Sequence, residues 1–198
     1  MESFHFEGVE IAPGSGVEVS LELGEGPTGN PRSIPVYVMH GTKPGPVLAL
    51  TAGIHGDELN GVSVVHHLIH GDDHVAGTED DRISREDLAG TLICVPVVNI
   101  EGMLLEQREA PDHRDINRLF PGKKQGNQSQ RIAYALFQAV VKRADYLIDL
   151  HSAPLSRTNL PHVRANFEKD KCMELARAFG THIILHSSGP KGSLRRTA

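Results

Sequence analysis

Two short segments of this 198-residue chain carry the residue types of a metal site. In GIHGDE (residues 53–58), the imidazole of His55 and the carboxylate of Glu58 are three residues apart. A tight turn followed by the first turn of a helix can direct both groups to one point. In DLHS (residues 149–152), His151 follows an apolar segment. Two histidines, one glutamate and an open fourth position are typical of a catalytic zinc site, whereas structural sites are closed by four protein ligands.

Each segment also has a simpler explanation when it is taken alone. A histidine followed three residues later by a glutamate is common at solvated helix starts, where the helix dipole favours a carboxylate such as Glu58. A histidine at a strand end, such as His151, is often only hydrogen-bonded. The conjunction favours the metal interpretation, because ligand groups of open α/β sheets gather beyond the carboxyl ends of strands and can meet there despite a large separation in sequence.

A third segment, RDINRLFPG (residues 114–122), offers groups that suit an anionic substrate. Asn117 supplies amide donors and Arg118 a guanidinium fork, which together can hold a carboxylate. Asp115 can lie behind the metal site and orient a ligand histidine. A surface turn with its charges in water explains the same residues equally well, so this segment by itself leaves both interpretations open.

The surrounding sequence alternates strand-like and helix-like patterns, which favours an α/β layer fold. Two apolar runs, residues 34–39 and 47–54, flank the turn-forming HGTKPGP and predict a hairpin. Residues 90–98 are almost continuously apolar, as in a strand covered on both faces, with Pro96 placed late in the strand or on an edge. The other predicted elements are helices at 57–70, 128–142 and 168–179 and strands at 145–150, 160–165 and 182–186.

Two polar features remain in this pattern. Residues 99–127 show little periodicity, and a loop of this length inside a compact domain is usually functional. Several histidines lie on or just beyond the predicted helix at 57–70, and a polar helix face explains them. They are His66, His67, His70 and His74.

Composition limits the class of protein. With 39% hydrophobic and 23% charged residues, residues 1–198 suit a single globular domain, in which 1–30 form a lead-in strand or hairpin region. The net charge of −5 and the scattered Lys and Arg argue against nucleic acid as a partner. No run approaches the roughly 20 apolar residues that span a bilayer, and the N-terminus lacks the features of a secretory signal. We therefore expect a cytoplasmic protein without a membrane partner.

The two cysteines, Cys94 and Cys172, lack the spacing of a metal or disulfide motif. We expect both to be buried free thiols. The sequence does not determine the oligomeric state.

Three motifs, GIHGDELNG, DINRLFPG and DLHSA, occur in an order and spacing that resemble the succinylglutamate desuccinylase/aspartoacylase family, a branch of the zinc carboxypeptidase-like hydrolases. The resemblance runs from about residue 30 to the C-terminus. It implies an α/β fold of the zinc carboxypeptidase-like (phosphorylase/hydrolase-like) type. Such a fold has three layers, with a mixed, mostly parallel sheet and helices on both faces.

The resemblance implies one zinc ion per chain as the cofactor. His55, Glu58 and His151 correspond to the zinc ligands of the family. Asp115 corresponds to a carboxylate that supports His55.

The resemblance also implies a substrate site. Asn117 and Arg118 correspond to groups that bind the substrate carboxylate. An arginine before Asn117 polarises the scissile carbonyl group, and we place it at Arg108, with Arg114 as the rival because the spacing of this loop varies. The expected partner is a small molecule with a free carboxylate.

The residues after the last ligand, 156–164, are expected to line the pocket. Arg164 or Arg157 can bind a second acidic group of the substrate there, and a solvent-facing arginine is the equal alternative for each.

The activity implied by the resemblance is zinc-dependent hydrolysis of the amide bond of a small N-acyl amino acid, which is not a peptide bond. A metallocarboxypeptidase is the nearest alternative. A zinc-binding module without turnover is another, because the general-base glutamate of the family follows a stretch similar to HSSGPKGSLRRTA and no glutamate follows Glu174 here. We therefore expect a chain that is truncated at its C-terminus and lacks part of its active site.

Overall fold

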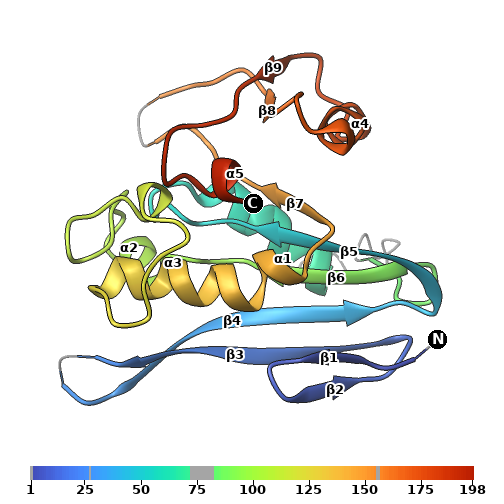
Figure 1. Cartoon of the computed structure of the whole chain (residues 1–198), viewed down its shortest axis with the longest axis horizontal. Coiled ribbons are helices and arrows are strands. Elements are labelled where there is room, and N and C mark those ends of the chain that lie inside the picture. Colours follow the sequence, from blue (N-terminus) through green and yellow to red (C-terminus); the bar gives the residue numbers. More distant parts are fainter. Residues whose placement is uncertain (1, 27, 72–82, 155–156) are drawn as a thin grey trace.

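The computed structural model describes residues 2–26, 28–71, 83–154 and 157–198 (Figure 1). Five strands precede the first α-helix, and strands, α-helices and short 3-10 helices (η) are mixed along the rest of the described chain. In order they are β1 (Phe4–Phe6), β2 (Val9–Ile11), β3 (Ser15–Glu25), β4 (Pro31–His40), β5 (Lys43–Thr51), α1 (Leu59–His70), β6 (Ala89–Val95), α2 (Ile100–Leu104), η1 (Ile116–Arg118), α3 (Gln128–Ala139), η2 (Val141–Arg143), β7 (Tyr146–Asp149), β8 (Val163–Ala165), α4 (Asp170–Ala178), β9 (Ile184–His186) and α5 (Leu194–Thr197).

Five strands form the central sheet in the order β3-β4-β6-β5-β7. β4 pairs antiparallel with both β3 and β6, whereas β5 pairs parallel with both β6 and β7. The expectation of an α/β fold with a mixed sheet is confirmed. Parallel pairings do not predominate in the described part of this sheet, because the N-terminal lead-in adds the long strand β3 in an antiparallel hairpin.

The predicted hairpin between residues 34–39 and 47–54 is wrong. These segments form β4 and β5, but β6 lies between them. β6 is buried at all but its first residue, so a central position covers its apolar side chains on both faces. The chain passes from β4 to β5 across the start of β6. A Cβ atom at Gly41 or Gly45 would overlap the backbone of Leu88 or Ala89, and one at Gly90 would overlap the backbone of Pro46.

Helices cover both faces of the sheet. Val65 of α1 packs in one cluster with Leu50 of β5. Leu136 of α3 packs in another cluster with Ala49, the preceding residue of β5. Because successive residues of a strand point to opposite faces, α1 and α3 lie on opposite sides of the sheet.

The other predicted elements are present with shifted ends. α1 begins at Leu59 rather than at residue 57, because Glu58 is its N-cap. Pro96 directly follows β6, late in the predicted strand as expected, and β6 is not an edge strand. Among the described residues, none of the helices has the length and apolar character that a bilayer crossing requires.

The two cysteines differ in their surroundings. Cys94 is buried in β6, and this burial raises the pKa of its thiol to about 12. Cys172 is only partly buried, so the expectation of two buried thiols is wrong for it. Its helix, α4, packs against the short strand β8.

The C-terminal segments form a small unit beyond β7, on the side of the sheet opposite to β3 (Figure 1). β8 and β9 pair in parallel, and α4 packs against β8. The last residues then return to the main body. Leu194 of α5 is fully buried in the core, and the N–H group of Phe120 donates to the carbonyl oxygen of Gly192 at 2.9 Å.

Candidate metal centre

The three predicted metal ligands follow two neighbouring parallel strands. β5 ends at Thr51 and β7 ends at Asp149, and these two residues are partners in the strand register. The segments that carry the ligands therefore leave the sheet side by side. Ligand groups that are far apart in the sequence meet there because the carboxyl ends of parallel strands share one edge of the sheet.

A tight turn brings His55 and Glu58 to the same point. Gly53 has a φ of 59°, which glycine adopts without strain. The backbone of Gly56 lies against that of Gly102, and a Cβ atom at position 56 would overlap it. These glycines leave the room that the turn needs.

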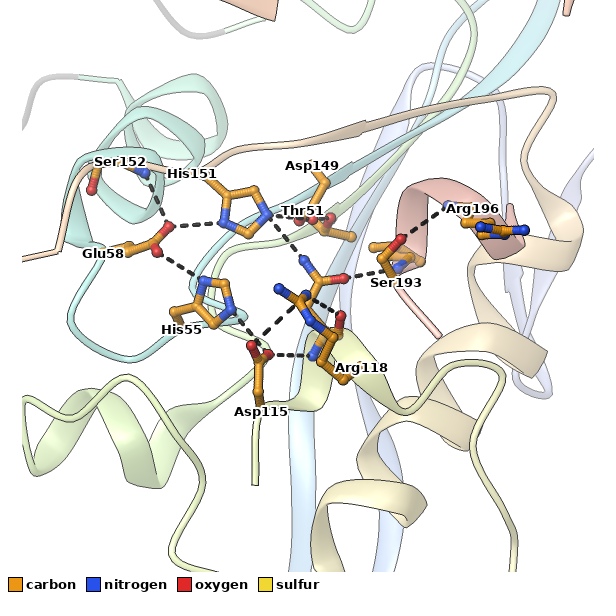
Figure 2. Close-up of polar contacts among 12 residues, drawn as sticks. Thr51, His55, Glu58, Asp115, Arg118, Asp149, His151, Ser152, Ser193 and Arg196 are labelled. Atoms are coloured by element: carbon orange, nitrogen blue, oxygen red, sulfur yellow. Dashed lines mark hydrogen bonds and ion pairs between the residues drawn. The ribbon is translucent and has the colours of Figure 1, made fainter. Parts of the chain in front are cut away.

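Glu58 lies between the two imidazole rings (Figure 2). Its Oε1 atom is 2.8 Å from Nδ1 of His55, and its Oε2 atom is 2.8 Å from Nδ1 of His151. One ligand atom from each residue lies within 4.8 Å of the other two. His55 and Glu58 are buried, whereas the side chain of His151 is 35% exposed, so the cluster is accessible on the His151 side. This set of two imidazoles and one carboxylate fits zinc with a position left open.

A carboxylate lies behind each imidazole. Nε2 of His55 is 3.1 Å from Oδ1 of Asp115, and Nε2 of His151 is 2.7 Å from Oδ2 of Asp149. The hydroxyl group of Thr51 donates to the other oxygen of Asp149 at 2.8 Å. A proton held on each Nε2 by these carboxylates leaves each Nδ1 atom to face the cluster, which is the usual arrangement behind metal-binding histidines.

The cluster is strongly coupled electrostatically. Burial raises the pKa of the Glu58 carboxyl, but hydrogen bonds and charges from His151 and His55 outweigh burial and hold this pKa well below its ordinary value. Burial likewise raises the pKa of Asp115, but the hydrogen bond and charge of His55 and the charge of Arg108 lower it to about 2.

The histidines shift in the opposite direction. Burial lowers the pKa of His151, but Asp149 and then Glu58 outweigh it and raise the pKa to about 10. Burial also lowers the pKa of His55, and the hydrogen bonds to Asp115 and Glu58 raise it above its ordinary value. A metal ion that binds to these imidazoles therefore has to displace protons.

Arg108 lies against the same cluster. Its Nη1 atom donates to Oε1 of Glu58 at 3.0 Å, and its Nη2 atom donates to Oδ2 of Asp115 at 3.3 Å. Arg114, the rival position, is exposed. Among the interactions of the described residues, none joins the side chain of Arg114 to the cluster.

Of the two residues predicted to bind the substrate carboxylate, Asn117 lies next to His151 and Arg118 lies against Asn117. The backbone N–H group of Asn117 donates to Asp115 at 2.8 Å, and its Nδ2 atom lies 3.5 Å from Nε2 of His151. The N–H group of Leu194 donates to Oδ1 of Asn117 at 2.8 Å, which fixes the orientation of this amide. Arg118 donates to the carbonyl oxygen of Asn117 at 2.7 Å, and its side chain is 49% exposed.

Arg195 lies within electrostatic range of two other arginines and of Asp149. Burial lowers the pKa of Arg195, the charges of Arg164 and Arg118 lower it further, and the charge of Asp149 opposes this shift. Arg195 therefore lies close enough to Arg164, Arg118 and Asp149 for their charges to act on it. Arg164 is exposed on β8, and Arg157 is exposed in the segment before it. Ser156 lies outside the described residues.

Sequence reasoning missed two groups at this site. Asp149 had a detectable signal, because residues two apart in an extended strand point to the same side and Asp149 precedes His151 by two. Nothing in the sequence around Arg195 predicts its position. That position depends on the packing of α5 against the loop that carries Asn117, where the N–H group of Leu194 donates to the Asn117 side chain.

We expect the Asp149→Asn variant to bind zinc about 10- to 100-fold more weakly, because the carboxylate that orients His151 is lost. Competition with a chromophoric chelator would measure this affinity. Asp145 provides a matched control at the other end of β7, since its carboxylate accepts a hydrogen bond from the N–H group of Val47 and does not touch the cluster. An equal loss in Asp145→Asn would show that charge alone causes the effect and that Asp149 does not orient the ligand.

A family model for the succinylglutamate desuccinylase/aspartoacylase catalytic domain matches residues 44–198, which is more than half of the chain. The chain belongs to this family. The resemblance of its three motifs is thereby confirmed. The chain is 32% identical over 153 residues to the N-alpha-acetyl-L-2,4-diaminobutyric acid deacetylase of Halomonas elongata. That match covers 74% of this chain and 41% of the deacetylase.

Solved structures agree with this family assignment. A succinylglutamate desuccinylase/aspartoacylase from Rhodobacter sphaeroides is 28% identical with a TM-score of 0.73, and the match covers 91% of this chain and 52% of that one. The murein-tripeptide amidase MpaA from Escherichia coli O157 is 16% identical with a TM-score of 0.57, covering 87% of this chain and 74% of that one. The likeness to the amidase concerns the fold alone. The chain therefore spans about half or less of the length of the Halomonas elongata and Rhodobacter sphaeroides proteins.

Proposed function

We propose that this chain is the zinc-binding part of a hydrolase that cleaves the amide bond of small N-acyl amino acids. The observation that carries the proposal is the meeting of His55, Glu58 and His151 beside the predicted carboxylate clamp of Asn117 and Arg118. Membership of a deacylase family supports it, as does the similarity to a deacetylase of an N-acetylated amino acid.

Zinc is the proposed cofactor, at one ion per chain. One ligand atom from each of His55, Glu58 and His151 lies within 4.8 Å of the other two, and the ε nitrogens are already held by Asp115 and Asp149. A zinc ion in such a site supplies Lewis acidity, which acidifies water and polarises a carbonyl group. The fold that we propose is the three-layer type of the zinc carboxypeptidases, with α1 and α3 as the outer layers.

The residues of the chain would position the substrate around this centre. Arg118 is half exposed, so its free N–H donors can bind the carboxylate of an N-acyl amino acid together with the fixed amide of Asn117. Arg108 keeps further donors beyond its bonds to Glu58 and Asp115, and these can stabilise negative charge on the carbonyl oxygen. Arg164 and Arg195 add positive charge that suits a second acidic group or the same carboxylate.

The carboxylate clamp can be tested by binding, which does not depend on turnover. We expect Arg118→Ala to raise the Kd of an N-acetyl amino acid about 10- to 100-fold, because hydrogen bonds to a charged group contribute about 1.5–3 kcal/mol. Calorimetry on the zinc-loaded chain, with Nα-acetyl-2,4-diaminobutyrate as one of the ligands, would measure it. The corresponding N-acetyl amine without a carboxylate should bind weakly to both proteins.

Arg114→Ala is the matched control, because Arg114 is an exposed arginine of the same loop. A loss in Arg114→Ala that equals or exceeds the loss in Arg118→Ala would contradict the assignment of the clamp. Preference for an acylated dipeptide over the N-acetyl amino acid would instead favour the metallocarboxypeptidase alternative.

A further inference from the structure

A pair of histidines lies on the exposed side of α1, away from the candidate zinc centre. His66 and His70 are four residues apart, and both are exposed. Their ring centroids are 4.6 Å apart, and the ring planes are inclined by 45°. Residues four apart on a helix lie above one another on the same face, so their side chains can approach one ion. Two histidines with this spacing on a helix form the metal-binding face of zinc metalloproteases.

We propose that His66 and His70 form a second, weaker transition-metal site, which binds Ni²⁺ and Cu²⁺ and prefers Cu²⁺ to Zn²⁺. Imidazole nitrogens suit these ions, and the affinity of one site generally rises from Ni²⁺ to Cu²⁺ and falls again at Zn²⁺. Two protein ligands leave the other coordination positions to water. The site is therefore weaker than the three-ligand cluster and fills only when metal is in excess.

The surroundings of the pair restrict the ring of His70. Its ring centroid lies 5.9 Å from that of Tyr37 and 4.6 Å from that of His66. Tyr37 is in turn held by Arg85, which donates to its hydroxyl oxygen at 3.0 Å. This packing limits the freedom of the His70 ring, so less entropy is lost when it binds metal.

The position of His70 on the helix favours a bound cation. His70 is the last residue of α1, where the helix dipole presents its negative end and favours positive charge. The residue His74, which lies near this end in the sequence, is outside the described residues and takes no part in the proposed pair.

The second site is separate from the first. Glu58 is the N-cap of α1, and His66 follows it by eight residues on the same helix. At a rise of about 1.5 Å per residue, this places the two sites about 12 Å apart along the axis. No side chain can serve both ions, so the two sites can be tested independently.

The test uses the His151→Ala chain without an affinity tag, so that the first cluster is already damaged. Calorimetric titration with nickel chloride at pH 7.5 should show one binding event per chain. This event should weaken about tenfold or more in both His66→Ala and His70→Ala, because a chelate needs both ligands. His67→Ala is the matched control, since it removes a histidine from the same turn of the helix. It should leave the binding event unchanged.

Two further measurements test whether both histidines bind the metal. Added Ni²⁺ should raise the Tm of the His151→Ala chain and not that of the chain that carries both His151→Ala and His66→Ala, because a ligand that binds only the native state stabilises it. The visible absorption band of bound Cu²⁺ should also shift when either histidine is removed. Unchanged nickel affinity in either variant, or equal losses in His67→Ala, would overturn the proposal. Because His151 is absent throughout, these outcomes do not depend on the proposed hydrolase activity.

Discussion

The purified and dialysed chain is expected to carry about one zinc ion, and His151→Ala is expected to carry none. His151 is one of the three ligands that we propose among the described residues, and its loss leaves Glu58 with one imidazole partner. The effect should therefore be near complete loss, larger than the weakening expected for a supporting carboxylate. Elemental mass spectrometry would give the metal content directly, and we expect the same loss for His55→Ala.

His182→Ala is the control for this measurement, because His182 is exposed and lies in the small C-terminal unit. It should retain the metal. Circular dichroism would show whether His151→Ala remains folded. Unchanged zinc content in His55→Ala, in a folded protein, would refute the ligand assignment, and an absence of zinc in the parent chain even after zinc is supplied would refute the site.

The Halomonas elongata deacetylase continues beyond the region that matches this chain, and that part can be fused after residue 198. We expect the fusion to raise the rate of deacylation about 10²- to 10⁴-fold. The reason is that hydrolysis needs a general base, and the carboxylates of the described site are already engaged. Glu58 bonds both imidazoles, while Asp115 and Asp149 each hold one of them. Glu168 and Glu174, the two glutamates after His151, are exposed, and no described interaction joins them to the cluster.

The rate of release of the free amino acid from Nα-acetyl-2,4-diaminobutyrate would measure the gain. In the control fusions, each glutamate of the added segment is replaced in turn by glutamine. One of these fusions should fall back to the rate of the unfused chain. If the fusion folds and binds zinc but gains no activity, or if its gain survives every replacement, the zinc-binding module without turnover becomes the better interpretation.

Local sequence patterns determined most of the secondary structure of this protein and the residue types of its candidate site. They gave the residue types of the cluster and their positions at strand ends, since strand and helix periodicities are properties of neighbouring residues. They also gave the tight turn before α1, because glycines flank His55 and leave room for the backbone. The Asn117 and Arg118 segment was recognised as chemically suited to an anion before its place was known.

The order of the strands was decided by the tertiary structure. Residues 34–39 and 47–54 resemble the two arms of a hairpin, yet β6 inserts between them. The central position goes to the strand that is stabilised most by burial on both faces. Local sequence patterns do not show which of several apolar strands that is.

The completed site also depends on long-range contacts. His151 meets Glu58 only because β5 and β7 pair in parallel, with Thr51 opposite Asp149. Arg195 comes near that side only because α5 returns to the loop of Asn117. The sequence thus determined which groups can bind a metal and an anion. The packing of distant segments decided which of them share one site, because the approach of two side chains is set by the backbones that carry them.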